Sequence, residues 1–210
     1  MSIKFPSPMS ADKDGLLAVG GNLEPETLLA AYSSGIFPWF SEQSPILWWC
    51  PDPRMVLFPD QFHVSRRLRR RLAKACYRHS WDESFPEVIQ SCASIPRAGE
   101  NGTWILPEMI QAYERLHAQG FAHSLEVWEQ DRLIGGVYGV LHKGVFFAES
   151  MFSRQTDASK MALAHLVDRA LVEGWKIIDC QFYTAHLDSL GAREISREAF
   201  LQILASPDVA

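Results

Sequence analysis

The spacing of apolar and polar positions predicts a chain of mixed helices and strands. The clearest helix is expected over residues 158–173, where apolar positions recur at helical spacing and Gly174 follows. Further helices are expected over residues 26–34, 84–94 and 107–119, and strands over 55–58, 123–128, 133–141, 145–148 and 175–181. A strand meander followed by a helix and another strand is typical of the α+β class.

A basic segment follows the first of these strands. Val64, Leu68, Leu72 and Cys76 recur every four residues, which predicts a helix with one apolar face. The remaining positions carry basic residues with no acid among them: Arg66, Arg67, Arg69, Arg70, Arg71, Lys74 and Arg78. Because like charges at this density repel one another, the pattern favours an anionic partner such as RNA phosphates. A solvated helix face is the alternative.

Composition places the chain among globular proteins. It has 210 residues, 47% of them hydrophobic, with 20 basic and 25 acidic residues, so its net charge of −5 hides the basic segment. The length predicts one full domain and a smaller one, and the stiff Pro51-Asp52-Pro53 turn suggests the boundary. We therefore expect a small N-terminal domain over residues 1–54 and a larger domain over residues 55–210.

The cysteines and the chain start bear on location. Cys50, Cys76, Cys92 and Cys180 have neither disulfide nor zinc-site spacing, so free thiols and no metal site are expected. The start lacks the apolar block of a secretory signal, and no apolar run is long enough to span a membrane. These features predict a cytoplasmic protein, and nothing in the sequence demands more than a monomer.

Two tryptophans are candidates for binding a nucleobase. Trp39 and Trp104 lie beside turn residues, in IFPWF and GTWI, rather than in periodic segments. An indole ring at a loop edge can stack on a base. The alternative is that they belong to a tryptophan-rich core.

The strand over residues 175–181 is the most promising place for chemistry. Because side chains on a strand alternate, Asp179 and Gln181 are expected on one face and Cys180 on the other. A carboxylate bonded to the amide NH₂ of Gln181 would aim the amide oxygen at an attacking amine. An ordinary polar strand end is the alternative. Glu149, placed at the end of an apolar strand, is either paired within the fold or available to a cationic ligand.

Several motifs then resemble one known family. The segments GLLAVGGNL, GIFPWF, WWCPDPR, GTWI, FFAESMFSR, ASKMAL, IIDCQ and SLGA occur in this order between Phe5 and about Ala192. The chain resembles the leucyl/phenylalanyl-tRNA–protein transferases, and GIFPWF, WWCPDPR and ESMFSR are the most specific matches. The resemblance implies transfer of Leu or Phe, and Met less well, from aminoacyl-tRNA to the N-terminal Arg or Lys of a protein. That transfer marks the protein for degradation by the N-end rule, and no cofactor is implied.

The resemblance also implies a fold and residue roles. The larger domain would be similar to the acetyl-CoA-dependent N-acetyltransferase fold. Asp179 and Gln181 would be catalytic with Glu149 at the same site, and Trp39 and Trp104 would contact the terminal adenosine. The charge of the basic segment agrees with this function, because its helix could hold tRNA phosphates. By position, the amino-acid side chain would be bound by an apolar pocket formed by Val137, Phe146, Leu163, Leu166 and Ile178.

Three other functions compete with this one. A coenzyme A acyltransferase normally holds pyrophosphate in a glycine-containing loop before the long helix, and residues 153–158 contain no glycine. A non-catalytic tRNA-binding module would have no use for Asp179 and Gln181. A hydrolase using Cys180 and His186 is disfavoured because Cys180 is expected to face away from Asp179.

Overall fold

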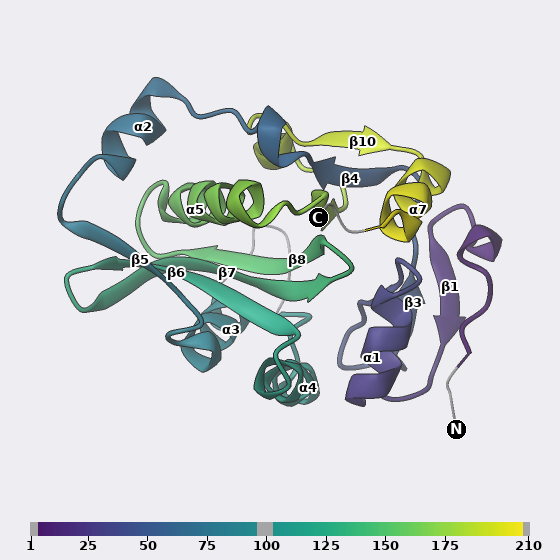
Figure 1. Ribbon diagram of the computed structural model, residues 1–210. Coiled ribbons are helices and arrows are strands. Elements are labelled where there is room, and N and C mark those ends of the chain that lie inside the picture. The colour runs from purple at the N-terminus through teal and green to yellow at the C-terminus, as the bar shows by residue number, and fades with distance from the viewer. Residues whose placement is uncertain (1–3, 96–102, 208–210) are drawn as a thin grey trace.

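The computed structural model describes residues 4–95 and 103–207; Gly102 of the GTWI motif and both chain ends lie outside them. The α+β prediction is confirmed, with two sheets and helices on both faces of the larger one (Figure 1). The small sheet has the order β1-β3-β2 and is antiparallel. Its strands are β1 (Leu16–Val19), β2 (Phe37–Pro38) and β3 (Leu47–Trp49), and α1 (Pro25–Tyr32) connects the first two.

The large sheet has the order β10-β4-β9-β8-β7-β6-β5. Neighbouring strands are antiparallel except β8 and β9, which are parallel. Its strands are β4 (Arg54–Leu57), β5 (Tyr77–Trp81), β6 (Ala122–Glu129), β7 (Arg132–His142), β8 (Val145–Ser153), β9 (Ile177–Gln181) and β10 (Arg193–Ile195).

Helices cover both faces of the large sheet. The long helix α5 (Ala158–Glu173) and the short helix α2 (Arg66–Leu72) lie on one face, and α3 (Phe85–Ser94) and α4 (Pro107–Ala118) pack on the other (Figure 1). The remaining helices are α6 (Ala185–Asp188), α7 (Arg197–Ala205) and the 3₁₀ turns η1 (Pro8–Ser10) and η2 (Pro59–Gln61). One apolar core joins the small sheet, α1 and α7 to the α3/α4 face, and a second lies under α5.

Most predicted elements are found within a few residues of their expected bounds, but two predictions are wrong in extent. The basic helix ends at Leu72, and Cys76 beyond it is exposed, so the apolar periodicity does not continue to residue 76. The strand predicted over residues 145–148 continues to Ser153, which places Glu149 inside a strand rather than at its end. The division into domains at residues 54 and 55 stays a prediction.

The parallel strands β8 and β9 part near the middle of the sheet. Their pairing runs from Val145–Ile177 to Phe147–Asp179 and goes no further in the described residues. A bulge in β8 leaves Glu149 without a cross-strand partner on β7, and a register shift between β4 and β9 does the same for Cys180. Because bulges redirect side chains and bend strands, Glu149 and the end of β9 face the gap that opens between the two strands.

Candidate active site

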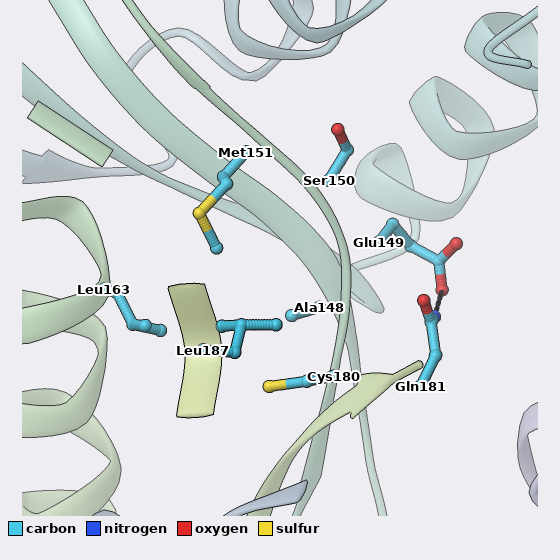
Figure 2. Close-up of a pocket in the computed structure, with 8 residues that line it drawn as sticks. All are labelled: Ala148, Glu149, Ser150, Met151, Leu163, Cys180, Gln181 and Leu187. Atoms are coloured by element: carbon cyan, nitrogen blue, oxygen red, sulfur yellow. Dashed lines mark hydrogen bonds between the residues drawn. The ribbon is translucent and has the colours of Figure 1, made fainter. Parts of the chain in front are cut away.

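Two pockets meet where β8 and β9 part. The first has a volume of about 210 Å³ and an apolar wall that includes Ala148, Met151, Leu163 and Leu187 (Figure 2). The second has a volume of about 290 Å³, and its wall is aromatic, with Phe37, Trp39, Trp104 and Phe182. Glu149, Cys180 and Gln181 line both pockets. The boundary between an apolar and an aromatic pocket is therefore polar.

Glu149 is held by three side chains. The hydroxyl of Tyr32 donates to its Oε1 at 2.8 Å, and the hydroxyl of Tyr113 donates to its Oε2 at 3.0 Å. The amide Nε2 of Gln181 donates to Oε1 at 3.1 Å, and Figure 2 shows the two side chains pointing toward each other. Tyr32 and Tyr113 lie on α1 and α4, and their two hydroxyl oxygens are also close enough to each other for a hydrogen bond. Glu149 is thus fixed from two helices and a neighbouring strand.

The surroundings of Glu149 change its acidity. Burial raises the pKa of its carboxyl from 4.5 to about 7, although the hydrogen bonds from Tyr32 and Tyr113 act in the opposite direction. The nearby Asp179 carboxylate raises this pKa further, and Arg54 lowers it. Burial also raises the pKa of both tyrosines well above 10, so each remains a hydrogen-bond donor.

The sequence-based pairing of Asp179 with the Gln181 side chain is wrong. The Gln181 amide donates to Glu149, whereas Asp179 accepts the backbone N–H of Gln181 at 3.0 Å. Asp179 is fully buried and lines neither pocket. Strand alternation could not reveal this, because the carboxylate that fixes the amide comes from β8, 32 residues earlier in the chain.

The partner of Asp179 is Arg54, the first residue of β4. Its Nε donates to Oδ1 at 2.8 Å and its Nη2 to Oδ2 at 2.6 Å, with both side chains fully buried. Burial alone would lower the pKa of Arg54, but the Asp179 carboxylate outweighs it and raises that pKa. Sequence analysis missed Arg54, Tyr32 and Tyr113. An arginine that begins the apolar strand RMVL was the available signal for Arg54, because a charge there requires a buried partner.

Trp39 and Trp104, the two candidate base-binding residues, both line the aromatic pocket. Trp39 is 39% exposed and contacts two other rings, Trp49 with a centroid distance of 5.6 Å and Phe182 with one of 5.5 Å. The indole N–H of Trp49 donates to the backbone oxygen of Trp39 at 2.6 Å. Trp39 is therefore held firmly while part of its ring remains accessible.

Of the five apolar residues proposed to bind the side chain, Leu163 lines the apolar pocket. The other four, which are Val137, Phe146, Leu166 and Ile178, are fully buried in the core beneath α5. The apolar lining beside Leu163 is instead formed by Ala148, Met151 and Leu187.

The basic helix α2 divides its arginines between two surroundings. Arg66, Arg69 and Arg70 are exposed and line a shallow hollow with Ala73, and Lys74 is exposed just beyond the helix. Arg67 and Arg71 instead contact Asp157, with Nε to Oδ2 distances of 2.8 and 3.2 Å. Arg78 lies on β5 and forms a bidentate pair with Glu83. Although no acid lies within the segment, these three arginines are paired with acids from outside it.

The described ranges contain no cluster of three or more His, Cys, Asp or Glu side chains able to hold a metal ion. Within the same ranges, no helix is both long enough and apolar enough to cross a bilayer.

Comparison with known families decides the relationship. A family model described as Leucyl/phenylalanyl-tRNA protein transferase matches residues 56–205, and one described as the N-terminal domain of that transferase matches residues 21–52. The chain belongs to this family. It is therefore an enzyme of the transferase class, and the resemblance found in the sequence motifs is confirmed.

Relatives that carry the name leucyl/phenylalanyl-tRNA–protein transferase match nearly the whole chain. The protein from Syntrophobacter fumaroxidans is 55% identical over 96% of this chain and 86% of its own length. The protein from Stutzerimonas stutzeri is 54% identical over 97% of this chain and 90% of its own length.

Among solved structures, a GCN5-related N-acetyltransferase from Kribbella flavida is similar with a TM-score of 0.43 and 10% sequence identity. The similarity covers 82% of this chain and 61% of that one.

Proposed function

We propose that this protein transfers leucine or phenylalanine, and methionine less efficiently, from aminoacyl-tRNA to the N-terminal arginine or lysine of proteins. The observation that carries the proposal is the hydrogen-bonded Glu149–Gln181 pair, which stands between an aromatic and an apolar pocket. An aminoacyl-adenosine has the same arrangement, with an aromatic base at one end, an apolar side chain at the other and an ester between them.

In this proposal the terminal adenine occupies the aromatic pocket. Trp39 and Trp104 offer flat surfaces there, and base–aromatic stacking contributes about 1–3 kcal/mol per base. The side chain of the amino acid enters the apolar pocket between Met151, Leu163 and Leu187. Because one methylene is worth about 1–3 kcal/mol in such a pocket, selection by volume admits some methionine.

The reaction needs orientation more than activation. The α-amine of the acceptor attacks the ester carbonyl carbon, a C–N bond forms, the C–O bond to the tRNA breaks, and the proton lost by the amine ends on the released ribose oxygen. Correct placement of the two reactants contributes about 7–11 kcal/mol. Since its Nε2 is bonded to Glu149, Gln181 keeps its amide oxygen to accept a hydrogen bond from the amine and aim the lone pair.

The tRNA body would be held by phosphate contacts. The exposed arginines Arg66, Arg69 and Arg70, with Lys74, offer a cationic surface that carries no base information. The substrates are charged tRNA and intracellular proteins, so the proposed location is the cytoplasm.

The structure disfavours one of the competing functions, the hydrolase that would use Cys180. Burial raises the pKa of the Cys180 thiol, which disfavours the thiolate that a hydrolase would need.

A transfer assay tests the proposal. The protein is incubated with labelled Phe-tRNA and peptides that begin with Arg, Lys or Ala and are otherwise identical. Label is expected on the Arg and Lys peptides and not on the Ala peptide. Equal labelling of all three, or tight binding of acetyl-CoA with no transfer from tRNA, would overturn the proposed function.

A variant separates transfer from binding. Gln181→Ala is expected to bind tRNA as the wild-type protein does and to transfer more slowly. Equal turnover in both proteins would favour a non-catalytic tRNA-binding module.

A further inference from the structure

Arg54 lies on β4, the strand next to the one that carries Gln181, and it lines neither pocket. We propose that Arg54 is a positioning residue for the transfer reaction: with Asp179 it fixes the backbone of Gln181, and so aims the Gln181 side chain at the reacting groups. This inference rests on the proposed function and adds a residue that the reaction requires without contacting substrate.

The contacts form a continuous chain from Arg54 to Gln181. Arg54 binds both oxygens of Asp179, at 2.8 and 2.6 Å, and Oδ1 of Asp179 accepts the backbone N–H of Gln181 at 3.0 Å. Charge-assisted bidentate contacts of this kind restrict a carboxylate to one orientation. The acceptor for the Gln181 N–H is therefore held in place by a side chain from the neighbouring strand β4.

Gln181 needs such support because its backbone is strained. Its φ is +63°, in the left-handed region that residues other than glycine rarely adopt. Strained conformations persist only where surrounding contacts enforce them. Here the enforced conformation ends β9 and leaves the side chain of Gln181 in contact with Glu149.

Arg54 also packs against two aromatic rings, one of which lines the aromatic pocket. Its guanidinium carbon lies 4.7 Å from the ring centre of Phe37 and 4.5 Å from that of Phe200. Phe37 lines the pocket that contains Trp39. In the part of the chain that the structure describes, Nη1 of Arg54 has no hydrogen-bond partner, so Asp179 and the two rings hold the guanidinium.

The geometry argues against a proton-relay role for Asp179. Both of its oxygens are engaged by Arg54, its side chain is fully buried, and it lines neither pocket. Asp179 thus acts through the main chain of Gln181. A neutral side chain with one acceptor oxygen at this position, such as asparagine, can still accept the backbone N–H of Gln181. It cannot act as a proton relay.

The test compares Arg54→Met with the double variant Arg54→Met/Asp179→Asn. Removing one partner leaves a buried charge unpaired, whereas the double variant is neutral and keeps an oxygen for the Gln181 N–H. Arg54→Met is expected to lower kcat for Phe transfer about 100-fold with little change in KM for the donor, since a misplacement near 1 Å has this effect. The double variant is expected to recover at least about tenfold of that loss.

A second measurement does not depend on activity. Hydrogen exchange of the backbone N–H of Gln181 is expected to be faster in Arg54→Met than in the wild-type protein. In the double variant it is expected to slow again, at temperatures where both variants remain folded. Arg197→Met is the matched control: Arg197 is another buried arginine, but its Nε donates to the backbone oxygen of Cys50. It is expected to change stability without changing Gln181 exchange or kcat.

The outcomes separate the inference from the proposed function. A wild-type protein that transfers nothing overturns the proposed function, and the amide exchange then decides the inference. Full kcat and unchanged exchange in Arg54→Met overturn the inference alone. If Arg54→Met does not fold, the double variant decides, because a folded double variant with no transfer would favour a relay through Asp179.

Discussion

Replacing Glu149 by glutamine tests whether its environment is as unfavourable to charge as the structure indicates. Burial raises the pKa of Glu149 to about 7 from 4.5. Each pKa unit corresponds to about 1.4 kcal/mol, so the ionised side chain lowers the free energy of unfolding by about 3 kcal/mol at pH values above 7. The neutral amide of Glu149→Gln has no such dependence on pH.

The sign follows from proton linkage. The folded protein binds the Glu149 proton more tightly than the unfolded chain, so this group's contribution to stability is full below about pH 4.5 and is lost as pH rises toward 7. Between about pH 5.5 and about pH 8, the wild-type protein is expected to lose about 2 kcal/mol relative to Glu149→Gln.

Urea denaturation of both proteins at the two pH values measures this difference. Taking the difference between the two proteins cancels the groups that titrate equally in both. Glu42→Gln, at an exposed position, gives the baseline for a glutamate-to-glutamine change. A Glu149→Gln effect that is the same at both pH values, within about 0.5 kcal/mol, would refute the reasoning.

Three further predictions concern the substrates. Trp39→Ala should weaken binding of puromycin-like adenosine analogues by about 1–3 kcal/mol in a calorimetric titration, and unchanged affinity with a lower Tm would return Trp39 to a structural role. Arg66→Ala or Arg70→Ala should reduce the slope of log Kd for tRNA against log salt by about 0.7–0.9. Asp157→Ala should make the slope steeper, because it frees Arg67 and Arg71 from their ion pairs. A slope near zero for the wild-type protein would remove α2 from the tRNA site. Leu163→Ala should enlarge the apolar pocket and raise kcat/KM for Phe relative to Leu, and an unchanged ratio in competition assays would exclude Leu163 from specificity.

Local patterns predicted most of the elements that carry the site. The helix Ala158–Glu173 was predictable because its apolar period and the following glycine are both local signals. Local patterns singled out Glu149, Gln181, Trp39 and Trp104 separately, and only the resemblance implied a shared site; the structure brings all four to the wall of one pocket. The lining of the apolar pocket could not be predicted from local patterns. The depth of a side chain beneath a helix depends on packing that periodicity does not encode.

The hydrogen-bond partners could not be predicted from local patterns. Strand alternation assumes a regular strand, and the bulges at Glu149 and Cys180 break that assumption at the site itself. The partner of Asp179 is Arg54, 125 residues away in sequence, and the basic helix is partly neutralised by the distant Asp157. Long-range ion pairs of this kind are set by the assembled sheet.

The two pockets that share Glu149, Cys180 and Gln181 also bear on turnover. A ligand that filled both pockets, as the proposed donor would, would gain affinity from the covalent link between its two ends. Cutting that link at the boundary leaves two ligands, each held on one side only. If the proposed transfer takes place there, completing it would weaken the binding of both products, so that release would follow from the chemistry itself.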